Sequence, residues 1–204
     1  MTRLRLTLLG AALAPLALAG CVTLFPKSRP VTLYRFEADL PAAAQNGGPP
    51  LTVRLGPASF DQTAAGHQIM TVTGEQVAYL SGARWAAPAQ DLFDAAVDHG
   101  FNEAGGRAHL MRAGAPGHAN LALQISVTRF EADYLSGPTS PPTVVVRLRA
   151  QLARESGMVA IGAQEFDVRV PATQNRVGAI VRAFNQATTK AIGSLIDWVD
   201  SAAS

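Results

Sequence analysis

Alternating apolar and polar residues mark two long segments in the second half of the chain. Apolar side chains occupy every second position over 121–127 and again over 143–152. In the second segment, Arg147 and Arg149 fall on the face opposite the apolar one, beside Val145. A period of two is typical of a strand with one face buried, so both segments predict strands.

A third segment of the same kind follows after a short interruption. Glu155-Ser156-Gly157 predicts a tight reversal, and alternation resumes at Val159, Ile161 and Ala163 before moving to Phe166, Val168 and Val170. The phase of the pattern therefore slips by one residue, which predicts a β-bulge near Gln164 or Glu165. The pattern as a whole predicts a hairpin.

Two segments have a helical period instead. Pro88 suits a first helical turn, and Gly105-Gly106 predicts where the first helix ends. The second helix begins at about Arg176 and has the strongest stripe in the chain, opposite a polar face. Its stripe comprises Val177, Ile180, Val181, Phe184, Ala187, Ala191, Ile192, Leu195, Ile196 and Val199.

Shorter patterns complete the expected sheet. Strands are predicted over 31–37, 51–55 and 108–111, and two more lie within 68–80, joined by a turn at 73–75. The pentapeptide RFEAD occurs at 35–39 and again at 129–133. Each copy is expected to end a strand, with phenylalanine inward and the charges facing water.

We therefore predict one α+β domain with a largely antiparallel or mixed β-sheet and two main helices packed on it. Its predicted bounds are residues 31–204.

The N-terminus carries a different kind of pattern. Arg3 and Arg5 precede an apolar and small-residue run over 6–18, which is too short for a membrane-spanning helix. This arrangement predicts a secretory signal over residues 1–20. Leu18-Ala19-Gly20-Cys21 resembles the lipobox of bacterial lipoproteins, which implies cleavage between Gly20 and Cys21 and lipid attachment to the cysteine. The alternative is a plain signal peptide.

Residues 21–30 are interpreted as a lipidated tether. The nine residues after Cys21 span at most about 30 Å, so the folded domain is expected to stay near the membrane. Cys21 is the only cysteine, which excludes an internal disulfide.

Charge gives no support to nucleic-acid binding. The chain holds 17 Lys and Arg against 15 Asp and Glu, and removal of Arg3 and Arg5 leaves 15 against 15. The predicted mature chain is therefore formally neutral.

No catalytic motif is present in the sequence. His67, His99, His109 and His118 are scattered, and the chain contains no HExxH, GxSxG or phosphate-binding loop. We therefore expect no enzyme activity, no bound metal and no cofactor other than the covalent lipid on Cys21.

The first predicted helix places three carboxylates on one face, at Asp91, Asp94 and Asp98. They are interpreted as a solvated face. A docking stripe or cation site is the alternative.

The stretch before this helix combines two aromatic residues and a cation with a proline: Tyr79, Trp85, Arg84 and Pro88. Trp85 is expected to close one end of the core, with Arg84 paired to an acid or stacked on a ring. A partner surface is the alternative reading.

This stretch also carries a family resemblance. VAYLSGARWAAPAQDLFDAAVDHGF resembles the signature before the first helix of the ABC-type transport auxiliary lipoprotein family, the PqiC-like group. The resemblance continues through LALQISVTRFEA, the hairpin VVVRLRAQLARESGMVAIGAQEFDVRVPA and the closing helix with AFNQAT and LIDWV. It covers about residues 31–200.

The resemblance implies a non-enzymatic lipoprotein that faces the periplasm. Its implied partners are an MCE-domain protein and an ABC permease and ATPase that move lipids between membranes, and a ring-shaped homo-oligomer is a further implication. Val22 is similar to the sorting pattern for the outer membrane, whose inner leaflet is the expected site of the anchor. A lipid-binding carrier, another envelope-assembly role and an envelope hydrolase remain as alternatives.

Overall fold

The computed structural model describes residues 30–40 and 49–202. Along the chain these form, in order, β1 (Thr32–Tyr34), β2 (Leu51–Leu55), β3 (Ser59–Phe60), β4 (Gln68–Thr73), β5 (Gln76–Trp85), α1 (Ala89–Ala104), β6 (Ala108–Arg112), β7 (Leu121–Asp133), β8 (Thr143–Arg154), a short 3₁₀ turn (Ser156–Met158), β9 (Val159–Pro171) and α2 (Val177–Ala202). The predicted α+β class with a mixed sheet and two helices is confirmed.

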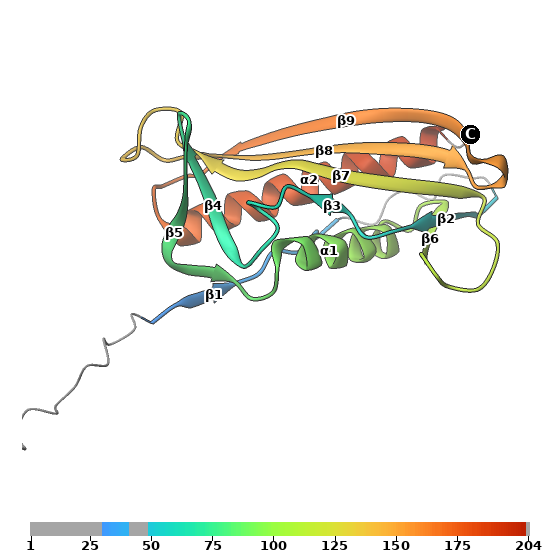
Figure 1. The fold of residues 1–204 in the computed structure, drawn as a ribbon, viewed down its shortest axis with the longest axis horizontal. Helices are drawn as coiled ribbons and strands as arrows, with labels where there is room; N and C mark the ends of the chain where they lie inside the picture. Colours follow the sequence, from blue (N-terminus) through green and yellow to red (C-terminus); the bar gives the residue numbers. More distant parts are fainter. Residues whose placement is uncertain (1–29, 41–48, 203–204) are drawn as a thin grey trace, which may run out of the picture. The chain divides into compact units, whose positions relative to one another are not determined.

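The long strand β7 organises the sheet. One of its edges pairs antiparallel with β8, which pairs antiparallel with β9 (Figure 1). Along its other edge β2, β3 and β4 follow one another, all parallel to it. The β4–β5 hairpin then brings β1 in beside β5, and β6 pairs with β2. The long strand β7 therefore aligns three short strands, β2, β3 and β4, along one edge.

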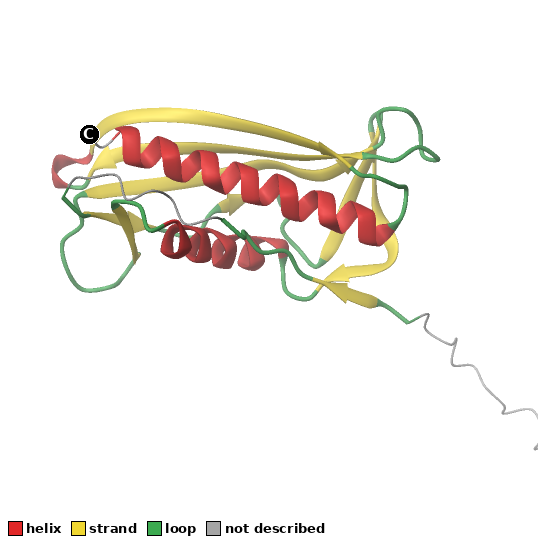
Figure 2. Ribbon diagram, turned by 180° about the vertical axis from the view of Figure 1, so that it is seen from behind, coloured by secondary structure: helices red, strands yellow, loops and turns green. Residues whose placement is uncertain are grey.

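Both helices cover the same face of this sheet. Viewed from behind, α2 crosses β7, β8 and β9, and α1 lies beside it (Figure 2). The predicted stripe of α2 faces the core, with only Val177 partly exposed, whereas Arg182, Gln186 and Lys190 face away from it. Helix α1 begins after Pro88 and ends at Gly105, whose φ of 60° suits glycine at a helix C-terminus.

The two RFEAD copies meet in the core. Phe36 and Phe130 are both buried, and their ring centroids lie 5.1 Å apart. Trp85 and Phe184 complete the cluster, with Trp85 edge-on to Phe36 at 5.0 Å and to Phe184 at 5.3 Å. Aromatic pairs in this geometry contribute about 0.5–1.5 kcal/mol beyond their buried area. The cluster therefore links β5, β7 and α2 to the segment after β1.

Two strand predictions need correction. Strand β1 ends at Tyr34 rather than at residue 37, because β5 offers it partners only over Ala83–Trp85. Strand β5 continues to Trp85 instead of ending at Leu80, since pairing with β1 extends it past a bend at Gly82, whose φ is 70°.

The predicted bulge exists, but at a different place. Leu152 pairs with Gly162 and Ala153 with Ala160, so the extra residue is Ile161 rather than Gln164 or Glu165. Ala163 consequently faces the side without helices. A small side chain such as alanine is accommodated on either face, so the pattern alone left the position of the slip ambiguous.

Candidate functional site

The residues singled out before the first helix do not converge on one site. Trp85 is buried, while its backbone N–H donates to the His67 carbonyl at 2.7 Å and its own carbonyl lies 3.2 Å from His67 Nδ1. Pro88 directly precedes α1, and its carbonyl accepts a hydrogen bond from the Leu92 N–H. Trp85 and Pro88 thus position the entry to α1.

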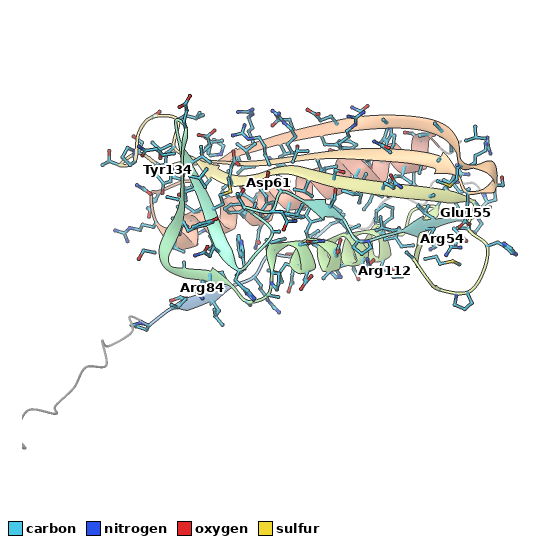
Figure 3. All side chains as sticks on the ribbon, viewed as in Figure 1. Arg54, Asp61, Arg84, Arg112, Tyr134 and Glu155 are labelled. Carbon is cyan, nitrogen blue, oxygen red and sulfur yellow. The ribbon has the colours of Figure 1, made fainter. Side chains whose placement is uncertain are left out.

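Tyr79 and Arg84 lie on the surface. The Tyr79 hydroxyl donates to the Thr63 carbonyl at 3.2 Å, and 40% of this residue is exposed. The Arg84 side chain lies near β1 (Figure 3), and none of the described residues forms an ion pair or ring contact with it. The expected pairing of Arg84 is therefore absent from the described part of the chain. Gly20 and Cys21 lie outside the described residues.

The sheet face without helices carries charge at one end. Arg129 Nε donates to Glu131 at 2.7 Å and its Nη2 donates to Asp133 at 3.0 Å, and both carboxylates are largely buried. Burial alone would lower the pKa of Arg129, but these hydrogen bonds raise it. The charges of the second RFEAD copy therefore do not face water as expected. They pair with one another on β7.

Next to this group, Asp167 on β9 bonds the guanidinium groups of Arg147 and Arg169. Burial would raise the pKa of Asp167, and the two arginines lower it instead. This half of the face is therefore occupied by satisfied ion pairs.

The other half of the same face is hollowed and lined mainly by uncharged residues. A groove of about 510 Å³ lies across β7, β8 and β9 near the tip of their hairpin. Small residues line much of it, together with Gln124, Gln151 and Met158: the small residues are Ala122, Ala153, Ala160, Gly162 and Ala163. Because Ile161 is the extra residue of the bulge, Ala160 lies opposite Ala153 on this face. A regular strand would place Ile161 there instead.

Arg149 is the charged residue of this groove. It lies opposite Glu165 in the β8–β9 register, yet Glu165 pairs with Arg147 at 3.7 Å. Arg149 has no ion-pair partner within the described ranges. The groove therefore combines small uncharged residues with an arginine that forms no ion pair among the described residues, which suits a ligand or partner segment with both apolar and anionic groups.

An ion pair connects β2 to the β8–β9 turn, next to the groove. Arg54 on β2 pairs with Glu155 at the β8–β9 turn, and the two side chains point toward each other in Figure 3. Arg54 Nη2 also donates to the Gly117 carbonyl at 2.9 Å, and Glu155 accepts from the Ala119 N–H at 2.5 Å. The hydrogen bond from Arg54 lowers the pKa of Glu155.

The carboxylates of α1 have structural partners. Asp94 accepts a hydrogen bond from the Ala58 N–H at 2.9 Å, and Asp98 pairs with Arg112. Burial raises the pKa of Asp94 despite that hydrogen bond and the nearby Arg112. The predicted solvated face is thus wrong for Asp94 and Asp98, which tie α1 to the chain before β3 and to β6. Across residues 30–40 and 49–202, no three His, Cys, Asp or Glu side chains are grouped as metal ligands.

Comparison with known proteins decides the family. A family model described as ABC-type transport auxiliary lipoprotein component matches residues 34–193. The chain belongs to this family. The resemblance noted from the sequence is therefore confirmed, and membership of a lipoprotein family implies association with the cell envelope. No described helix of this auxiliary lipoprotein is both long and apolar enough to cross a membrane.

Solved structures share the fold. A protein from Xanthomonas campestris is 22% identical with a TM-score of 0.69, covering 86% of this chain and 95% of its own. A hypothetical protein from Chlamydia trachomatis is 7% identical with a TM-score of 0.51, covering 74% of this chain and 96% of its own. No curated protein matches the sequence significantly.

Sequence reasoning missed the groove because three strands contribute its residues. The only local signal was the outward face of each strand, where alanine, glutamine and a single arginine replace the usual charged residues.

Proposed function

We propose that this auxiliary lipoprotein is held by lipid on Cys21 in the inner leaflet of the outer membrane. From there it faces the periplasm and docks an MCE-domain protein served by an ABC permease and ATPase. The role is non-enzymatic. The observation that carries the proposal is the groove on the helix-free sheet face, in a chain of this family. Alanines line it together with Arg149, which has no ion-pair partner in the described part of the chain.

The position of the groove supports a docking role. It lies at the hairpin end of the sheet, whereas β1, which follows the predicted tether, lies at the other end (Figure 1). The groove and β1 thus lie at opposite ends of the domain, which favours contact between the groove and a second component. The ring-shaped oligomer stays a prediction.

Site-specific photocrosslinking in native envelopes tests the docking role. A photoreactive residue at Gln151 in the groove is compared with one at Lys190, which is exposed on the outer side of α2. We expect capture of an MCE or ABC component from position 151 alone. Capture of neither, or equal capture from both positions, contradicts the proposal.

The anchor is tested separately with labelled palmitate. The wild type is expected to incorporate the label, and Cys21→Ala is expected to lose it. An unlabelled wild type contradicts lipid attachment.

A lipid carrier is the second candidate, because a groove lined by alanines and one cation also suits a lipid with an anionic headgroup. Lipid extracted in equimolar amount from the purified, unacylated mature chain would favour it over docking.

A further inference from the structure

The strand that follows the tether exposes apolar side chains where an edge strand is expected to be polar. Val31 is 46% exposed and Leu33 is 62% exposed. Leu33 is the middle residue of β1, and Val31 directly precedes this strand. The intervening Thr32 points the other way, and Tyr34 lies opposite the buried Trp85. The Leu33 side chain thus projects from the face opposite Tyr34 and Trp85.

A cation lies directly beside them. Leu33 and Arg84 are partners in the β1–β5 register, so both side chains project from the same face of the sheet. Arg84 is exposed and has no ion-pair partner among the residues that the structure describes. Val31, Leu33 and Arg84 are called the tether-end patch below.

The chain before this patch defines what is near it. Cys21 lies ten residues before Val31, and the sequence between them contains Lys27 and Arg29 but no acid. If Cys21 carries lipid, a segment of this length keeps the patch within about 35 Å of the bilayer. Lysine and arginine near an anionic membrane are attracted to its headgroups, while exposed leucine and valine favour the acyl boundary.

We infer that the tether-end patch is a second membrane contact, which binds an anionic lipid surface and orients the domain with its β8–β9 hairpin directed away from the bilayer. This inference rests on the proposed lipid anchor. It adds an orientation that one flexible attachment point does not provide.

The patch is tested on the mature chain, residues 21–204, carrying Cys21→Ser and no lipid. The described core lies between Phe36 and Val199. Leu33→Cys, labelled with an environment-sensitive fluorophore, is mixed with vesicles of phosphatidylethanolamine and phosphatidylglycerol. Val159→Cys is the matched control, since Val159 is 58% exposed at the hairpin end.

A blue shift is expected for the label at position 33 and none for the label at 159. No shift at 33, or equal shifts at both positions, overturns the inference. A shift at 33 that grows with protein concentration and needs no vesicles assigns the patch to a second copy of the chain, and also overturns it.

Charge is tested in the same assay. Arg84→Glu is expected to weaken vesicle binding about tenfold, which corresponds to about 1.4 kcal/mol. Arg154→Glu, an exposed arginine at the hairpin end, is expected to leave binding unchanged, and equal losses for both variants contradict the patch. Palmitate labelling tests the lipid anchor separately. If the wild type incorporates palmitate but the label at position 33 shows no shift with vesicles, only the membrane contact of the patch is refuted.

Discussion

The close approach of α1 and α2 makes opposite predictions for two glycines in helix interiors. Gly100 lies in α1, and an added Cβ would come within 2.8 Å of Ile192 Cγ2 and 3.1 Å of Leu40 Cδ1. Gly193 lies in α2, where the nearest atom to an added Cβ is Leu40 Cδ2 at 3.1 Å. An alanine at position 100 therefore contacts the stiff side chain of Ile192, whereas an alanine at position 193 contacts the flexible end of Leu40.

The magnitudes follow from two opposing terms. Alanine in place of glycine favours a helix interior by about 1 kcal/mol. Overpacking a core costs about 1–3 kcal/mol, and the Ile192 Cγ2 methyl group, fixed to a β-branched carbon, has little freedom to yield. We expect Gly100→Ala to lower the free energy of unfolding by up to about 2 kcal/mol. Gly193→Ala is expected to leave it unchanged or raise it by up to about 1 kcal/mol.

Urea unfolding of the mature chain, followed by circular dichroism and tryptophan fluorescence, measures both changes. The loss for Gly100→Ala corresponds to a fall in Tm of up to about 8 °C for a domain of this size. Ile192→Ala removes the clashing methyl group, so it is expected to cost about 1 kcal/mol less in the Gly100→Ala background than alone. Equal stabilisation by both glycine substitutions would refute the helix contact.

Three further predictions concern polar groups. Thr188 is fully buried in α2 and its Oγ1 has no hydrogen-bond partner among the residues that the structure describes, so Thr188→Val is expected to raise the free energy of unfolding by about 1 kcal/mol. A loss of stability in urea would contradict this. Arg129→Met leaves two largely buried carboxylates unpaired on β7 and is expected to cost about 2–4 kcal/mol in the same assay; a change below 1 kcal/mol would show that water satisfies them. The lowered pKa of Glu155 makes its carboxylate stabilising above the ordinary pKa of glutamate, and this contribution is lost as the pH falls through the lowered value. Glu155→Gln is therefore expected to have a lower free energy of unfolding than the wild type at pH 7 and an equal one near pH 2. A difference that persists at pH 2 would assign the effect to hydrogen-bond geometry instead of charge.

Elements with strong local patterns were predictable from the sequence. Strand β8 alternates Val144, Val146 and Leu148 against Arg147 and Arg149, and the structure buries the first set and leaves the arginines on the other face. Helix α1 lies between Pro88 and Gly105, as its end signals predicted. In these segments one period dominates and one face must be buried, so residue spacing alone determines orientation.

Only the tertiary structure decided how these elements combine into a surface. The parallel alignment of β2, β3 and β4 along β7, the bulge at Ile161 and the unpaired state of Arg149 all depend on residues far apart in the chain. The local hydropathy pattern predicts whether a side chain is buried. It does not predict which residue, distant in the chain, forms an ion pair with a charged side chain. The anchor at Cys21 rests on a local motif and stays a prediction, whereas the groove and the tether-end patch each depend on the sheet bringing side chains from distant segments together.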